Sequence, residues 1–413
     1  MPPYRPDPRW LELHGLHDVV APASFPEHTL RWRNDRAAAQ VGLHTLTDTA
    51  WREHFAAFVP LPDNLPEPLA LRYHGHQFGH YNPDLGDGRG FLFAQVRDAD
   101  GRLLDLGTKG SGPTPYARNG DGKLTLQGAV REILAAELLE ARGVPTCRIL
   151  SVVETGEALR RTDEPSPTLS AVLVRLSHSH VRIGTFQRLA FLEDHDGLRA
   201  LTAYVGTHLL PEVDGPLSLL QVAGERLLDT CAAWMAAGFV HGVLNTDNLC
   251  ITGESFDYGP WRFTERWNPR FTAAYFDHGG FYAFGRQPWA IGHGLVRLAG
   301  ALSRIADGPD LQEVLHTLEA SFDRRLHRAL LRRLGLSPRS PDADQALGEA
   351  IEAFLATGAV PIERFVRDWT GGVAGAERAL AGEASEVYRG RAFDGVRRAL
   401  TGYTSDARPP QGP

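Results

Sequence analysis

Residues 238–249 read GFVHGVLNTDNL, and the triplet Asp257-Tyr258-Gly259 begins nine residues after Asn248. The segment follows a helix-like stretch and is apolar at both ends, which is typical of a polar loop between two core segments. Asp247 and Asn248 could simply cap backbone amides in such a loop. They could also serve a divalent cation, because Mg²⁺ prefers hard oxygen ligands and needs few protein carboxylates.

The order of these residues is also the order found around the phosphate-transfer site of protein kinases. Kinases carry His-Arg-Asp, an Asn after four intervening residues, and then Asp-Phe-Gly, and the Asn and the second Asp hold the metal ions. His241, Asn248 and Asp257 keep this order, but position 243, where the kinase base stands, is valine. Asp247 is the nearest carboxylate that could replace that base. The combination favours a phosphate-handling loop over a capped turn.

The chain before residue 185 is expected to form a small β-rich unit. Strand-like runs lie at 90–96, 103–108, 146–153 and 170–176. A glycine-rich loop, 110–122, leads into a predicted helix at 124–142 that ends at Gly143.

The predicted helix at 124–142 has two distinct sides. Its apolar side consists of Leu126, Val130, Ile133, Leu134 and Leu138. Glu132 lies on another strip, among glycine and alanine residues that would let a carboxylate approach neighbouring backbone. In kinases a strand lysine pairs with a glutamate of the following helix. Glu132 is therefore either the partner of Lys109, which ends the preceding strand, or a solvated helix residue.

Lysine is almost absent from the chain. Among 43 basic residues only Lys109 and Lys123 are lysines, and both fall in or beside the glycine-rich loop. Arginine does not replace a compact ammonium on a flexible stem where that shape is needed. The bias predicts that at least Lys109 contacts a phosphate, although two surface lysines could also survive by chance.

Helical periodicity dominates after residue 185, at 186–210, 218–237, 292–305, 310–334, 342–356 and 376–400. The prediction is an α+β, two-lobed protein-kinase-like fold. Its parts are a segment at 1–65 packed on the body, a β-rich N-lobe at 66–184, a helical C-lobe at 185–403 and a disordered tail at 404–413.

Composition excludes several classes of protein. The net charge of −7 argues against nucleic-acid binding, and no run approaches the roughly 18 apolar residues that a membrane span needs. Cys147, Cys231 and Cys250 are too few and too scattered for a disulfide framework, which favours a cytoplasmic location.

Further candidates are weaker when taken alone. Arg175 and Arg182 could bind phosphates but could equally be surface or ion-pair residues. The glycines of GDGRG (86–90) permit close backbone approach to a phosphate, although so short a motif is unspecific. The histidines of YHGHQFGH (73–80) are irregularly spaced, so packing or hydrogen bonding is favoured over metal binding.

Several long motifs occur together and in order between residues 70 and 290. They are YHGHQFGHYNPDLGDGRG, LGTKGSGPTPYARNGDGK, VRLSHSHVRIGTF, HGVLNTDNL, DYGP and DHGGFYAFGRQP. With these motifs the chain resembles the selenoprotein O family of protein adenylyltransferases. The resemblance implies a kinase-like fold that binds ATP in a flipped orientation and transfers AMP to Ser, Thr or Tyr hydroxyls of proteins. No cysteine follows Cys250, whereas the family often ends in a cysteine or selenocysteine.

The resemblance also implies roles for individual residues. Asp247 would accept the hydroxyl proton, and Asn248 and Asp257 would bind Mg²⁺, or Mn²⁺ in its place. Glu132 would orient Lys109. The implied nucleotide-binding residues are Gly86, Gly88, Arg89, Lys109, Asp121, Gly122, Arg175, Arg182 and Asp257. Transfer of the γ-phosphate by a kinase, transfer of UMP from UTP, and a non-catalytic nucleotide-binding scaffold remain alternatives.

Overall fold

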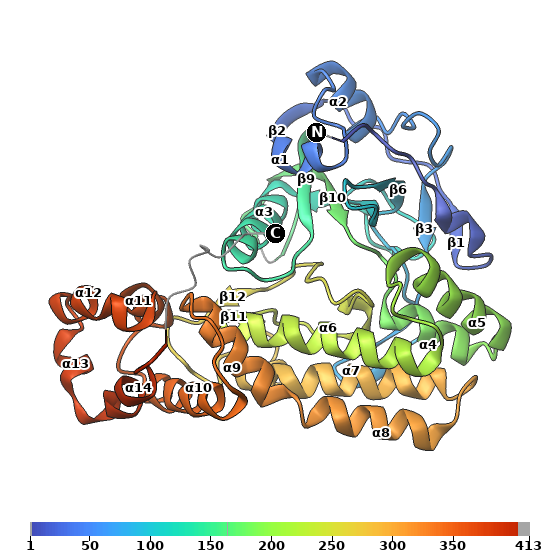
Figure 1. Cartoon of the computed structure of the whole chain (residues 1–413). Coiled ribbons are helices and arrows are strands. Elements are labelled where there is room, and N and C mark those ends of the chain that lie inside the picture. Colours follow the sequence, from blue (N-terminus) through green and yellow to red (C-terminus); the bar gives the residue numbers. More distant parts are fainter. Residues whose placement is uncertain (1, 163, 404–413) are drawn as a thin grey trace.

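The computed structural model describes residues 2–162 and 164–403, so the predicted tail at 404–413 lies outside the described part. One antiparallel sheet of eight strands organises the first half of the chain (Figure 1). Seven strands follow the order β1-β3-β6-β7-β10-β9-β2, and β8 pairs with β10 outside that path. Their bounds are β1 His17–Val19, β2 Thr29–Arg33, β3 Leu69–Leu71, β6 Leu92–Arg97, β7 Leu103–Lys109, β8 Leu124–Thr125, β9 Arg148–Leu159 and β10 Thr168–Ser177.

Strands β6, β7 and β10 match the predicted runs to within two residues at each end, whereas β9 continues to Leu159, six residues beyond the predicted 146–153. The segment before residue 66 contributes more than was expected, because β1 and β2 join the main sheet. Helix α1 (Asp35–Gln40) and helix α2 (Asp48–Phe55) pack into one core cluster. Trp51 and Phe55 of α2 are buried there together with Phe93 of β6. A separate hairpin, β4 (Gly75–Gln77) and β5 (His80–Asn82), follows β3.

Helix α3 (Leu126–Ala141) occupies the predicted position but buries a different side from the one that its apolar residues suggest. Val130, Leu134 and Leu138 are exposed, whereas Ala129, Ala135 and Ala136 are buried together with Glu132 and pack toward β9 and β10. The reason is geometric: small side chains let the helix approach the sheet closely, so the alanine strip becomes the interface.

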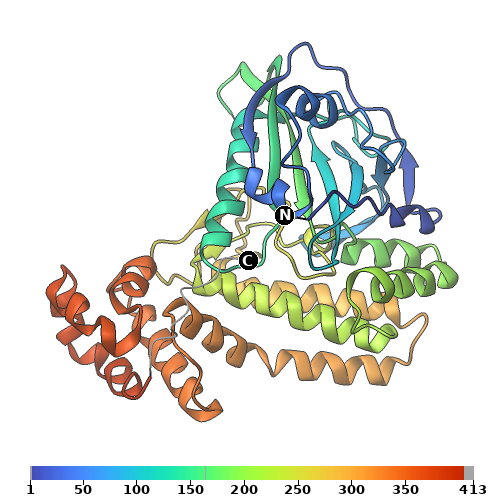
Figure 2. The same ribbon diagram turned by 45° about the horizontal axis from the view of Figure 1, so that its top comes forward.

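The second half is helical and lies below the sheet in Figure 1, with α10–α14 forming a group at one end that Figure 2 shows from another angle. The helices are α4 Ile183–Phe191, α5 His195–Tyr204, α6 Pro216–Ala236, α7 Gln287–Leu302, α8 Gly308–Glu319, α9 Phe322–Arg333, α10 Pro341–Ala356, α11 Ile362–Trp369, α12 Ala376–Ala381, α13 Ser385–Arg389 and α14 Asp394–Ala399. Short 3₁₀ or π turns are η1 Arg9–Glu12, η2 Val205–Leu209, η3 Thr246–Asn248, η4 Phe284–Arg286, η5 Gly372–Gly375 and η6 Arg391–Phe393. Helices and an antiparallel sheet in separate parts of the chain confirm the α+β class.

Three of the predicted helices are interrupted. The run 186–210 breaks between α4 and α5, where Glu193 has a φ of 55° and the side chain of Asp194 caps α5. The run 310–334 breaks at Ala320–Ser321, and 376–400 contains three short helices separated by Gly382 and Gly390. Periodicity persisted through these breaks because the flanking helices bury the same kind of side chains.

The 238–249 segment connects α6 to the sheet side of the molecule. It begins with β11 (Phe239–Val240), which pairs with β12 (Arg262–Phe263), and continues into η3. Asp247 and Asp257 lie on the loop that these two short strands close. Within the described ranges, no helix is both long and apolar enough to cross a membrane.

Candidate active site

A cavity of about 700 Å³ lies between the sheet and the loop that carries Asp257. Its lining brings together residues from strands, loops and the start of α4 that are far apart in the sequence. All nine residues implied for nucleotide binding line it: Gly86, Gly88, Arg89, Lys109, Asp121, Gly122, Arg175, Arg182 and Asp257. Both lysines of the chain also line this cavity.

Lys109 lies at the centre of the polar contacts. It is the last residue of β7, it is 6% exposed, and its Nζ contacts Oε1 of Glu132 and donates to Oδ1 of Asp257 at 2.8 Å. Glu132 is only 1% exposed. Removing one partner of a buried ion pair leaves an uncompensated charge, at a cost of about 3–5 kcal/mol. The solvated alternative for Glu132 is therefore wrong.

Asp257 joins Lys109 to Arg175 of β10. Its Oδ1 also lies 3.4 Å from Nη1 of Arg175. Burial would raise the pKa of Asp257, but Lys109, Arg175 and Arg182 outweigh it and hold the pKa well below its usual value. Asp257 has a φ of 60°, a left-handed conformation that aspartate adopts more readily than most residues. The carboxylate therefore stays ionised and faces three cations.

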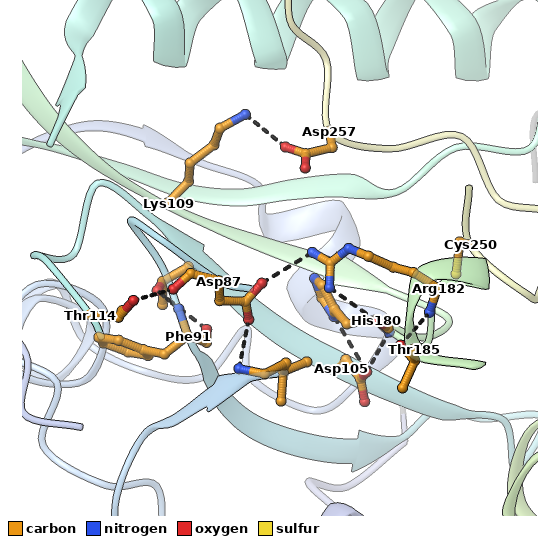
Figure 3. A network of polar contacts seen from close by, with 12 residues as sticks. Asp87, Phe91, Asp105, Lys109, Thr114, His180, Arg182, Thr185, Cys250 and Asp257 are labelled. Atoms are coloured by element: carbon orange, nitrogen blue, oxygen red, sulfur yellow. Dashed lines mark hydrogen bonds and ion pairs between the residues drawn. The ribbon is translucent and has the colours of Figure 1, made fainter. Parts of the chain in front are cut away.

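Arg182 is held in place from several directions (Figure 3). It is 1% exposed, its guanidinium stacks 4.2 Å from the ring centre of Tyr73, and its Nη2 lies 3.2 Å from Oδ1 of Asp87. Asp87 and Tyr73 also line the cavity. Neither residue was predicted from the sequence, although Asp87 lies between Gly86 and Gly88 of the GDGRG motif.

The loop at 114–122 forms the rim of the cavity. Tyr116 lies so close to Gly86 that a Cβ at that glycine would be 2.4 Å from the tyrosine ring. Asp121 pairs with Arg161 at 2.9 Å, and Lys123 pairs with Glu157. Gly86 is therefore required by packing of the rim, and Asp121 is exposed and already bound to an arginine.

Asp247 and Asn248 lie in η3, outside the lining of the cavity. Oδ2 of Asp247 accepts a hydrogen bond from Nε2 of Gln77 at 3.3 Å, while its buried Oδ1 has no partner among the described residues. Burial raises the pKa of Asp247 to about 6. The amide nitrogen of Asn248 donates to the Val243 carbonyl at 2.9 Å, and its amide oxygen accepts no hydrogen bond from the described residues.

Within residues 2–162 and 164–403, no three or more His, Cys, Asp or Glu side chains are placed to hold one ion. His74 and His76 instead make hydrogen bonds, to Tyr81 at 2.6 Å and to Gln187 at 2.7 Å. Cys147, Cys231 and Cys250 are buried and unpaired, which agrees with the absence of a disulfide framework.

Comparison with known proteins identifies the family. A model of the family described as "Protein adenylyltransferase SelO" matches residues 8–376, well beyond the motifs at 70–290. Proteins named protein nucleotidyltransferase YdiU are 49% identical in Synechococcus elongatus, over 79% of this chain and 66% of that protein, and 49% identical in Synechocystis, over 78% and 68%. A Ruegeria protein of the same name is 37% identical over 88% of this chain and 77% of its own length. The chain thus spans about two thirds of the length of the first two relatives. With its motifs, its cavity and a match over most of its length, the chain belongs to the SelO family of protein adenylyltransferases.

Proposed function

We propose that this chain transfers AMP from ATP to Ser, Thr or Tyr hydroxyls of protein substrates and releases pyrophosphate. We also infer that its sheet-containing and helical parts correspond to the two lobes of a kinase-like fold. Family membership supports nucleotidyl transfer, since the named relatives are protein nucleotidyltransferases. The proposal adds the identity of the nucleotide and of the acceptor.

The observation that carries the proposal is the concentration of buried cations around Asp257 in the cavity. Lys109, Arg175 and Arg182 are all buried, and all three act electrostatically on Asp257. A triphosphate tail would find several charge-assisted partners there. A tail held in this way favours reaction at the α-phosphorus, because the outer phosphates then leave together as pyrophosphate.

The proposed step is an in-line displacement. The acceptor hydroxyl oxygen bonds to the α-phosphorus while the bond from that phosphorus to the oxygen bridging the β-phosphorus breaks. The hydroxyl proton passes to Asp247, whose unpartnered Oδ1 is available as an acceptor. General-base catalysis of this kind contributes on the order of 10²–10⁴ in rate.

The residues present fit a divalent cation that is shared with the nucleotide. Asn248 offers an amide oxygen that has no hydrogen-bond partner among the described residues, and Asp257 supplies a carboxylate. Mg²⁺ commonly combines one or two protein ligands with substrate phosphates. Such an ion, Mg²⁺ or Mn²⁺, would offset the charge that develops on the phosphate oxygens.

Self-modification tests the proposal without knowledge of the protein substrate. The chain is incubated with Mg²⁺ and ATP labelled at either the α- or the γ-phosphate, and intact mass is then measured. We expect α-label and AMP-sized additions, which are lost in Asp247→Asn. A parallel incubation with UTP and Mn²⁺ reports on the nucleotide. Phosphate-sized additions carrying γ-label would overturn the proposal and make the chain a kinase.

A further inference from the structure

A buried row of side chains, Asp105, His180 and Arg175, runs from the interior of the sheet to the cavity. We propose that His180, fixed by Asp105, is a positioning residue that aims the Arg175 guanidinium at the outer phosphates of the nucleotide. The inference rests on the proposed function only in assigning Arg175 to the pyrophosphate portion of ATP.

The contacts are specific and buried. Nε of Arg175 donates to Nε2 of His180 at 3.3 Å, and Nη1 of the same guanidinium reaches Asp257 at 3.4 Å. On the other side of the ring, Nδ1 of His180 lies 3.3 Å from Oδ2 of Asp105, which also accepts from the His180 backbone amide at 2.7 Å. His180 is 3% exposed, and Asp105 is completely buried.

These contacts allow only one state of the histidine ring. An arginine Nε can donate but never accept, so Nε2 of His180 must present its lone pair. Its proton is therefore on Nδ1, where it is donated to Asp105. Burial lowers the pKa of His180, which agrees with a neutral ring. The remaining oxygen of Asp105 accepts from Nε2 of Gln95 at 2.7 Å, so the carboxylate itself cannot rotate freely.

One face of β7 carries both Asp105, which fixes His180, and Lys109, which lines the cavity. Successive strand side chains point to opposite faces, so Asp105, Gly107 and Lys109 share one face. Gly107 lies opposite Arg175 in the β7–β10 ladder, and a Cβ there would be 2.4 Å from Nε2 of His180. Gly107 therefore leaves the space that the ring needs, between the acid that fixes it and the lysine of the cavity. Figure 3 shows His180 directed at Asp105 beneath Arg182.

Arg175 thereby reaches the cavity with its orientation set by its own Nε. It is 4% exposed and lines the cavity, and a second cation, Arg182, donates from Nη1 to the His180 carbonyl at 3.2 Å. His180 thus contacts two arginines that line the cavity: Arg175 through its ring and Arg182 through its backbone carbonyl.

The test compares two substitutions of His180, each of which can keep one of the two hydrogen bonds that the ring makes. In His180→Gln the side-chain oxygen can occupy the position of Nε2 and accept from Arg175. In His180→Asn the shorter amide can reach Asp105 but not Arg175. Calorimetry on the full chain measures the dissociation constants of pyrophosphate and of AMP, and steady-state assays with ATP separate KM from kcat.

We expect His180→Asn to weaken pyrophosphate about tenfold, the usual worth of one charge-assisted hydrogen bond, and to leave AMP within about twofold. His180→Gln should recover most of that loss. Gly107→Ala, which displaces the ring without removing it, should behave like His180→Asn. Gly300→Ala on α7, where an added Cβ meets nothing within 4 Å, is the matched control and should bind like the parent chain.

Equal weakening of pyrophosphate and AMP in both histidine variants would reduce His180 to a structural residue and overturn the inference. Parental pyrophosphate affinity in His180→Asn and Gly107→Ala would overturn it as well. The readout is binding, so it stays informative if the γ-phosphate proves to be the transferred group. That outcome would remove the proposed function but not the aiming of Arg175.

Discussion

At the scale of single residues, the two lysines of the chain have separate roles within one cavity. Lys109 is buried between Glu132 and Asp257, whereas Lys123 is partly exposed and pairs with Glu157 at the rim. An arginine at position 109 would have to fit a larger planar group between two carboxylates that are spaced for an ammonium. The scarcity of lysine therefore has a structural meaning at position 109 that it lacks at 123.

Lys109→Arg is accordingly expected to lower turnover at saturating ATP about tenfold or more, which corresponds to at least ~1.4 kcal/mol of transition-state stabilisation. Lys123→Arg keeps a cation beside Glu157 and should change turnover less than about twofold. Both are measured as the rate of pyrophosphate release. Equal rates in the two variants would show that the shape of the cation at 109 is unimportant.

At the scale of elements, α3 shows that hydrophobicity alone does not choose the buried side of a helix. Leu134 is 48% exposed, while its neighbour Ala135 is completely buried. The alanine strip lets the helix lie close enough to β9 and β10 for Glu132 to reach Lys109. A helix that buried its larger side chains would stand farther from the sheet and would separate the two charges.

Substitutions on the buried alanine side of α3 should therefore lower the free energy of unfolding more than substitutions on the exposed leucine side. Leu134→Gln should change the free energy of unfolding by no more than about 0.5 kcal/mol. Ala135→Leu should destabilise the chain by about 1–3 kcal/mol, because the added methylenes overpack the interface. Denaturant unfolding of both variants measures the difference, and a larger loss for Leu134→Gln would mean that the leucine side is covered in solution.

At the scale of the whole molecule, the sheet and the helices meet around buried histidines. His178 follows β10 at this junction, and its backbone amide donates to Glu254 at 2.8 Å. Burial lowers the pKa of His178 to about 4, and Arg102 and Arg226 add to the effect. The unfolded chain binds a proton on this histidine near pH 6.5, whereas the folded chain does so only near pH 4. Its contribution to stability is thus complete above pH 6.5 and is lost as the pH falls toward 4.

We expect His178→Gln to lose less stability than the parent chain when the pH is lowered from 7 to 5, by on the order of 1–2 kcal/mol. Thermal or denaturant unfolding at both pH values gives this difference, whatever the variant costs at pH 7. His14→Gln, at an exposed position, is the control and should keep the parental pH dependence. An unchanged pH dependence in His178→Gln would show that folding does not lower the pKa of His178.

Local spacing in the sequence was enough to locate the main strands, the helix predicted at 124–142 and the ordered set His241, Asn248 and Asp257. Alternation defines a strand within six or seven residues, and the order His241, Asn248, Asp257 lies within a single loop. The nine residues implied for nucleotide binding were named from the family resemblance, and that resemblance rests on motifs of adjacent residues. These features are local, so the chain reveals them before it folds.

The tertiary structure alone decided which side of α3 is buried. It also decided which residues far apart in the sequence pair with one another. Asp87 meets Arg182 across 95 positions, and Asp105 meets His180 across 75. Such pairs cannot be recognised from spacing in the sequence, because the distance along the chain between the two elements that carry them follows no rule. Small side chains let α3 lie close to the sheet, and Gly107 leaves space for the His180 ring. Both features depend on how the elements pack. Only the folded sheet brings the cations, the carboxylate and the histidine behind them to one end of a cavity.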